Sequence, residues 1–401
     1  MLSPFNGSPA SFRFLSIMKF RPIVPSLALA LAVSSALAQA PAKLELQPGQ
    51  HISILGEGFA DRMQHSAWLE TLIHAKFAKD KLTVRDLAVS GDAVDTWHRS
   101  EDFGTRDSWL AWTEADVIFA FYGFNESFAG YDGIGKFKEN LDKFLKDAAK
   151  QNYGGKGAPR IVLFSPLAAE RHRDPNFPDP TNINSNVQNY TQAMADVAKD
   201  NNVQFVDLYT PSLKVFNEAA KQGKSLTVDG LQLTGEGEKA LAPLIFQAVF
   251  GEAAPQGDFT KLNEAVLEKN WQWHQRYRTI DGYNVYGGRS RMGYAPKDRN
   301  GKEIGEKIYN NPVMQREMQE RDVMTANRDA LVWARAEGGD LVVKDDNLPA
   351  PIPVQTNKPG DKEDLSWTYP SGEESIAKIK VHPGCKINLF ADEKQIGRAH
   401  V

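Results

Sequence analysis

Four short blocks of this sequence carry residue types that can hold or activate a carbonyl group. Three of them directly follow apolar segments and the fourth precedes a helical pattern: Gly56-Glu57-Gly58, Ser90-Gly91-Asp92, Gly123-Phe124-Asn125-Glu126 and Asp229-Gly230-Leu231-Gln232. Backbone N–H groups in tight turns and an asparagine amide are typical donors to a developing oxyanion. These four blocks therefore hold the candidate functional residues of the sequence.

Acid–base chemistry would need further groups near these blocks. Asp61 and His65 are four residues apart in a helical pattern, so they should share one face, and Glu57 adjoins the site. Together with Asp229, this set could activate a water molecule. The alternative interpretation is a capping and surface network of Asp61, Arg62 and His65, which is common on helices.

Other polar residues near the blocks have structural interpretations beside functional ones. Ser90 and Ser127 are typical of helix or turn caps. His98 follows two aspartates, but a metal site there would need ligands that the spacing does not supply, so no metal is expected. His172 falls in a charged loop. Most aromatic residues near the blocks should be core, whereas Phe124 and Phe128 could form a wall for a sugar or an acyl group.

The segments that must position these blocks alternate between two patterns. Near-continuous apolar runs, typical of buried parallel strands, alternate with amphipathic helical patterns. The expected strands are 52–55, 82–89, 116–122, 159–166 and 203–208, and the expected helices include 133–151, 184–200 and 234–250. This order predicts a three-layer α/β/α sandwich with a five-stranded parallel sheet over residues 44–251. The carboxyl edge of such a sheet is where ligands bind.

The pattern changes after residue 252. Helices are expected over 259–277 and 311–337, within a helical extension that covers 253–340. Residues 341–375, rich in proline and charge, are expected to be a linker. Residues 376–395 are expected to begin a truncated β domain, with two short strands around a Pro-Gly turn. The last six residues, IGRAHV (396–401), resemble the translation of a sequencing-library adapter and are expected to be an artefact.

The four blocks resemble those of the SGNH, or GDSL, hydrolase superfamily. That family has Gly-Asp-Ser after the first strand, a glycine after the second, Gly-x-Asn-Asp after the third and Asp-x-x-His near the end. The resemblance covers roughly residues 50–251 and implies an SGNH-hydrolase, flavodoxin-like fold. It also implies acyl-ester hydrolysis, with Gly58 at the serine position and Gln232 at the histidine position. The resemblance further implies that the N–H groups of Gly58 and Gly91 and the side chain of Asn125 bind a carbonyl or hydroxyl oxygen.

Those two departures decide the expected activity. Glycine offers no nucleophile, and glutamine does not exchange a proton near neutral pH. We expect a catalytically degenerate domain that binds a carbohydrate or an acylated glycan through Gly58, Gly91, Asn125, Glu57 and Gln232. The alternative is an active acyl-ester hydrolase or deacetylase with a non-standard set around Asp229, Glu57, Asp61 and His65.

The ends of the chain and its composition bear on location and partners. A basic segment, an apolar run and Ala36-Leu37-Ala38 predict a secretory signal peptide over residues 1–38, hence a periplasmic or extracellular protein with no membrane span in the mature chain. A net charge of −4 gives no case for nucleic acid, and the single cysteine excludes an intramolecular disulfide.

The arrangement resembles exported proteins in which such a domain precedes a propeller-type dehydrogenase-like module, sometimes with a haem domain. No C-x-x-C-H sequence occurs, so no cofactor is expected here. The expected partners are a small-molecule or glycan ligand and the missing propeller-like part.

Overall fold

The computed structural model describes residues 43–392. The predicted signal peptide and the terminal IGRAHV segment lie outside these described residues. The longest strand of the described sheet is β1 (His51–Gly56), which pairs with the central strand, β3. The order of strands across the sheet is β2 (Thr83–Asp86), β1, β3 (Val117–Phe121), β4 (Arg160–Phe164) and β5 (Gln204–Val206). All four strand pairs are parallel, which confirms the predicted sheet.

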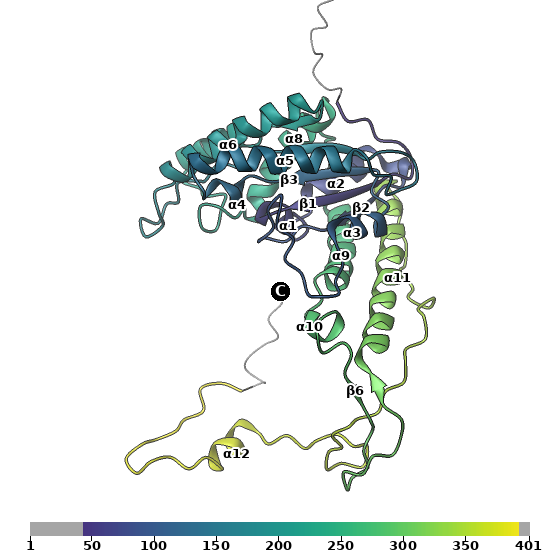
Figure 1. The fold of residues 1–401 in the computed structure, drawn as a ribbon. Helices are drawn as coiled ribbons and strands as arrows, with labels where there is room; N and C mark the ends of the chain where they lie inside the picture. The colour runs from purple at the N-terminus through teal and green to yellow at the C-terminus, as the bar shows by residue number, and fades with distance from the viewer. Residues whose placement is uncertain (1–42, 393–401) are drawn as a thin grey trace, which may run out of the picture. The chain divides into compact units, whose positions relative to one another are not determined.

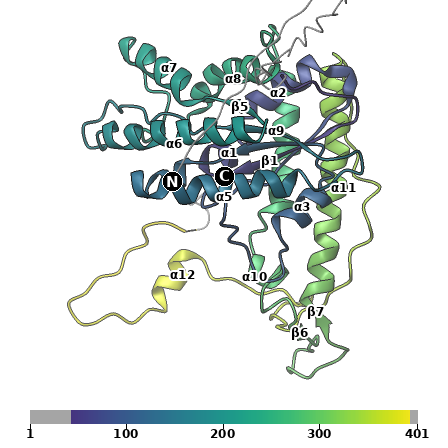
Figure 2. The same ribbon diagram turned by 45° about the horizontal axis from the view of Figure 1, so that its top comes forward.

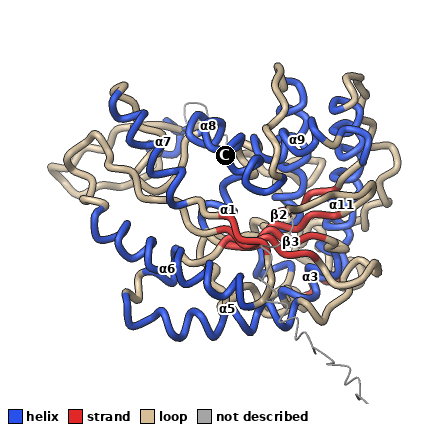
Figure 3. Tube along the Cα trace, turned by 90° about the horizontal axis from the view of Figure 1, so that it is seen from above, coloured by secondary structure: helices blue, strands red, loops and turns tan. Residues whose placement is uncertain are grey.

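Alternate residues of these strands face two separate apolar layers. Ile52 and Phe119 belong to one buried cluster, and Ile118 and Leu163 belong to the other. Since both faces are covered, β3 is buried at all five positions, as its near-continuous apolar run predicted. Figure 3 shows helices α5 and α6 on one side of the sheet and α7 and α8 on the other. The three-layer α/β/α sandwich is therefore confirmed.

Helices connect the strands of this part of the chain. They are α1 (Gly58–Met63), α2 (Trp68–Lys76), α3 (Arg106–Trp112), α4 (Phe124–Ser127), α5 (Ile134–Ala148), α6 (Thr181–Asp200), α7 (Tyr209–Lys221) and α8 (Gly235–Phe250), with short 3₁₀ turns η1 (Ala78–Asp80) and η2 (Tyr131–Gly133). Gly56 ends β1 with φ of +141°, and a Cβ there would lie 2.2 Å from the carbonyl oxygen of Phe121. Only glycine lets the ends of β1 and β3 approach so closely.

The continuous helix expected after Gly58 is broken. Helix α1 ends at Met63, and α2 begins at Trp68 after Ala67, which has the left-handed φ of 57°. The side chain of Gln64 donates from Nε2 to the carbonyl oxygen of Asp61 at 2.7 Å and so closes the first helix. His65 therefore lies in the turn between the helices, and the prediction that it shares a helix face with Asp61 is wrong.

The extension after the sandwich packs on the edge strand of the sheet. It contains α9 (Thr260–Tyr277), α10 (Gly282–Val285), the two-residue strands β6 (Gly293–Tyr294) and β7 (Ile308–Tyr309), and α11 (Asn310–Ala336). Helices α9 and α11 run side by side (Figure 1), and β6 and β7 lie at the end of α11 that is far from the sheet (Figure 2).

Side chains of this extension satisfy the outward-facing carbonyl groups of β2 and the residue before it. Trp333 Nε1 donates to Leu82 O at 2.8 Å, and Lys269 Nζ donates to Val84 O at 3.1 Å. Trp273 Nε1 donates to Asp86 O at 2.6 Å. A free strand edge would pair with other chains, so these donors close the edge of the sheet.

The last described segment departs from the expectation of two strands. Residues 341–371 contain no helix or strand, Gly372–Ala377 forms helix α12, and residues 378–392 contain a turn and no strand. A capping box between Ser371 and Glu374 starts α12. The expected strand pair around Pro383-Gly384 is therefore wrong for this chain. No helix within residues 43–392 has the length and apolarity needed to span a membrane.

Candidate functional site

A cleft of about 460 Å³ opens at the carboxyl edge of the sheet. Its wall combines the turn after β1, the loop after β2, the start of α4 and the segment before α8, which are the four blocks singled out in the sequence. Gly58, Asn125 and Gln232 all line this cleft, as do Glu57 and His65. The topology thus gathers residues that are far apart in the chain at one edge, as a parallel sheet requires.

The position of the family's nucleophile is open. Gly58 has no positive φ, and a Cβ built on it would meet no atom within 4 Å. The same is true of Gly91. Neither glycine is therefore imposed by sterics in this fold, and a side chain at residue 58 would project into free space.

Glu57 is a buried cap and is not available to a ligand. Its side chain is 3% exposed, and its two oxygens accept the backbone N–H groups of Phe124 (2.7 Å) and Asn125 (2.8 Å). Burial raises the pKa of Glu57 well above the usual value, and the nearby carboxylate of Glu126 raises it further. Glu126 in turn accepts the N–H groups of Gly123 and Val94. The hydrogen bonds of Glu57 and Glu126 therefore hold the loops at this edge of the sheet together.

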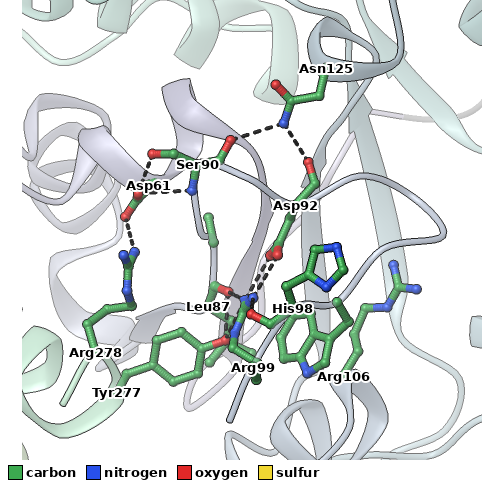
Figure 4. Close-up of polar contacts among 12 residues, drawn as sticks. Asp61, Leu87, Ser90, Asp92, His98, Arg99, Arg106, Asn125, Tyr277 and Arg278 are labelled. Atoms are coloured by element: carbon green, nitrogen blue, oxygen red, sulfur yellow. Dashed lines mark hydrogen bonds and ion pairs between the residues drawn. The ribbon is translucent and has the colours of Figure 1, made fainter. Parts of the chain in front are cut away.

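The side chain of Asn125 is also hydrogen-bonded to backbone groups nearby. Its Nδ2 donates to Ser90 O at 3.0 Å and to Asp92 O at 2.7 Å, as Figure 4 shows. An amide has two N–H donors, and both are used here. The side chain therefore has no donor left for an oxyanion, which differs from the role expected for it. Its Oδ1 remains able to accept a hydrogen bond from a ligand.

The loop after β2 is held by two further side chains, Arg99 from the same loop region and Tyr277 from the extension (Figure 4). Asp92 forms a two-pronged ion pair with Arg99, at 2.7 and 2.8 Å, and Arg99 also contacts the hydroxyl of Tyr277 at 3.2 Å. Burial raises the pKa of Asp92, while the hydrogen bonds from Arg99 oppose that rise. The Tyr277 hydroxyl donates to Leu87 O at 2.8 Å. The end of α9 thus fixes the path of residues 87–92.

Asp61 is held by groups other than His65. Its Oδ2 accepts the hydroxyl of Ser90 at 2.6 Å and the N–H of Ser90 at 3.1 Å, and its Oδ1 pairs with Arg278 at 2.9 Å. The ring of His65 instead packs edge-to-face on His274, with centroids 5.3 Å apart. Desolvation in this contact lowers the pKa of His65, so the ring is neutral at pH 7. The predicted Asp61–His65 pair does not form.

Asp229 stabilises a local turn. Its Oδ1 accepts the N–H groups of Leu231 at 2.9 Å and of Gln232 at 2.8 Å. Gln232 is exposed at the cleft wall. A histidine at position 232 would therefore have this carboxylate as a neighbour. A glutamine amide at the same position neither accepts nor releases a catalytic proton near neutral pH.

One further cleft residue was missed by sequence reasoning. Glu238, on α8, is 4% exposed and lines the cleft, and its carboxyl accepts the N–H of Trp68 at 3.0 Å at the start of α2. Burial raises the pKa of Glu238 to about 8. The only sequence signal was a glutamate on the otherwise apolar face of a helix, at a position that points inward.

The remaining candidates lie outside the cleft or are structural. Ser127 donates from its hydroxyl to Phe124 O at 2.7 Å within α4, so its contact is structural, but the caps of this helix are Gly123 and Phe128. The ring of His172 packs at a tilt against Phe177 in its loop, with ring centroids 4.2 Å apart. His98 is exposed, and no group of three or more possible metal ligands occurs within residues 43–392. The site therefore offers hydrogen-bond acceptors, open backbone turns and apolar walls, and it lacks an assembled nucleophile–imidazole pair among the described residues.

Comparison with known proteins places the cleft in a family. Residues 55–240 match the model of the GDSL-like Lipase/Acylhydrolase family. No curated protein sequence matches the chain. Among solved structures, a gut microbial diltiazem-metabolizing enzyme is similar at 16% identity with a TM-score of 0.41, over 53% of this chain and 48% of that one. This chain thus spans about half the length of that protein.

Two smaller proteins align over nearly their whole length. A catalytic mutant of an acetylxylan esterase from Geobacillus stearothermophilus has 16% identity and a TM-score of 0.38, over 53% of this chain and 100% of its own. A carbohydrate acetylesterase from Sinorhizobium meliloti has 14% identity and a TM-score of 0.35, over 50% and 98%. The family model thus identifies residues 55–240, the part of the chain that carries the cleft, as a GDSL-like lipase/acylhydrolase domain.

Proposed function

We propose that this protein is an exported SGNH-fold module that binds a carbohydrate or an acylated glycan and does not hydrolyse it. The observation that carries the proposal is an open cleft whose nucleophile and base positions are Gly58 and Gln232. The neighbouring carboxyls of Glu57, Asp61 and Asp229 all accept hydrogen bonds from protein groups. An acyl transfer needs a nucleophile and a proton acceptor in contact, and the residues at the two family positions, Gly58 and Gln232, can play neither part.

The shape and chemistry of the cleft support binding. Its volume falls in the usual range for small-ligand sites, roughly 300–1,000 Å³. Phe124 lines it and packs edge-to-face on Phe128, which is 65% exposed. Exposed aromatic faces beside amide acceptors suit a ligand with alternating C–H and hydroxyl surfaces. Asn125 and Gln232 supply those amide groups.

The alternative, an active acyl-ester hydrolase or deacetylase, is favoured by one contact. The hydroxyl of Ser90 lines the cleft and donates to Asp61 at 2.6 Å, which is a hydroxyl–carboxylate pair. Asp61 is also paired with Arg278, so its carboxylate is already engaged by a cation, and no imidazole contacts Ser90 among the hydrogen bonds of the described residues. We therefore rank this alternative below the binding function.

The test compares the full natural chain with a Gly58→Ser/Gln232→His double variant in hydrolysis of simple acetyl esters. The free space at residue 58 and the adjacent carboxylate of Asp229 favour a working triad in the variant. We expect no turnover by the natural chain and measurable turnover by the variant. Turnover by the natural chain that disappears on Ser90→Ala would contradict the binding function and support the alternative.

Export and the attachment to a propeller-like partner module belong to the same proposal. The support is the arrangement of basic, apolar and small residues near the start of the sequence. Expression in a bacterial host with the natural N-terminus should give a shortened protein in the periplasmic fraction. A full-length cytoplasmic product would contradict export.

A further inference from the structure

The cleft presents one accessible charge, and it is positive. Arg62, in the last turn of α1, lines the cleft and is exposed, and no ion pair or side-chain hydrogen bond within residues 43–392 engages its guanidinium. No other arginine and no lysine lines the cleft. His65 beside it is a neutral ring at pH 7, and the Arg62 charge is one of the causes that lower the His65 pKa.

The carboxyl groups around Arg62 are either buried or already bound to other groups of the protein. The two lining carboxyls, Glu57 and Glu238, are 3% and 4% exposed, and each caps a helix. Asp61, next to Arg62 in the chain, is paired with Arg278 and points toward Ser90. Asp229 accepts two backbone N–H groups in its own turn. A ligand in the cleft therefore meets a guanidinium without a competing protein carboxylate.

We infer that the natural ligand is an anionic glycan, whose carboxylate or sulfate group pairs with Arg62. This inference rests on the proposed glycan-binding function and names the substrate class. A guanidinium offers a planar fork of N–H donors that matches either anion with two parallel hydrogen bonds. The apolar wall at Phe124 and the acceptor of Asn125 would hold the neutral part of the same ligand.

The experiment uses the full chain and isothermal titration with three tetrasaccharides: neutral xylotetraose, tetragalacturonic acid and a sulfated galactan tetrasaccharide. At about 0.02 M NaCl we expect an acidic probe to bind about tenfold more tightly than the neutral one, since an exposed charge-assisted pair is worth about one decade. At about 0.3 M NaCl this preference should shrink, because salt screens exposed charges. The tighter of the two acidic probes identifies whether the anion is a uronate or a sulfate.

Variants assign the preference to its residue. Arg62→Gln should bind all three probes equally, Arg62→Lys should retain part of the preference, and Lys261→Gln, an exposed charge removal on α9 outside the cleft, should keep all of it. Equal affinity of the natural chain for neutral and acidic probes would overturn the inference and leave glycan binding intact. A preference that survives Arg62→Gln would overturn it as well. Absence of binding to all three probes would instead contradict the proposed function. The salt series on the natural chain tests the preference for anionic probes even if the variants do not fold.

Discussion

Arg278 and Asp61 join the extension to the cleft. Arg278 directly follows α9 and donates from Nη1 to Oδ1 of Asp61 at 2.9 Å, across 217 positions in the sequence. The second oxygen of Asp61 holds both the N–H and the hydroxyl of Ser90. The loop that carries Gly91 is therefore positioned through Asp61 by a residue outside the family-matched region. The extension is a structural part of the cleft.

Replacement of Arg278 by methionine should loosen that loop. The ion pair is about a third exposed at Arg278, so the expected loss of unfolding free energy is only about 1 kcal/mol. Hydrogen exchange of residues 87–92 should accelerate more than that of the rest of the sheet. The matched control is Arg291→Met, whose partner Asp102 is exposed; it should change neither quantity. Equal exchange in the two variants would refute the positioning role.

The covered edge of the sheet predicts a difference between two neighbouring tryptophans. Trp273 is buried and donates to Asp86 O, so Trp273→Phe leaves a strand carbonyl without its donor and should cost about 1–3 kcal/mol. Trp271, two residues away, is 49% exposed, and Trp271→Phe should be within about 0.5 kcal/mol of neutral. Urea unfolding followed by circular dichroism measures both. Equal losses would mean that the edge carbonyl is satisfied without the indole.

The sheet could be predicted from the sequence because its signals are local. The run from Asp116 to Tyr122 is apolar at nearly every position, which only a strand buried on both faces requires. The predicted ranges of β2, β3, β4 and β5 extend past the real strands by one to three residues at each end, whereas β1 is one residue longer than predicted at each end. The break at Ala67 was missed because its left-handed backbone is imposed by tertiary packing, and alanine carries no signal for it.

The location of the site could be predicted from the sequence, but its free hydrogen-bond donors and acceptors could not. The glycine and asparagine blocks mark strand ends, so their meeting at one edge follows from the parallel topology. Which donors and acceptors remain free depends on partners that are distant in the chain. Asn125 uses both N–H groups on residues of another loop, and Glu238 is buried by the start of α2, so neither fact has a local sequence signal.

The raised pKa of Glu238 predicts a pH-dependent stability. Its pKa is about 8 in the folded protein against 4.5 for an unperturbed glutamate, so the folded chain binds more protons than the unfolded chain between those values. Stability therefore falls as pH rises from about 4.5 to 8, by up to about 1.4 kcal/mol per pH unit from this group, and is level above that. Glu238→Gln keeps an acceptor for the N–H of Trp68 and removes the titration. The natural chain minus this variant, measured by urea unfolding at successive pH values, should show the decline. A difference that does not vary with pH would contradict the raised pKa.

The two hydrogen bonds of Asn125 separate a structural role from an oxyanion role. In the Gly58→Ser/Gln232→His background, Asn125→Ala removes both bonds to Ser90 O and Asp92 O and should lower the unfolding free energy by about 1–2 kcal/mol. Because neither N–H faces the cleft, kcat for acetyl-ester hydrolysis should fall by less than about tenfold. Loss of a true oxyanion donor would instead reduce kcat by roughly 10²–10³ with little change in stability. Parallel measurement of kcat and thermal unfolding in the double variant with and without Asn125→Ala distinguishes these results, and the second pattern would show that Asn125 turns toward the substrate once a nucleophile is present.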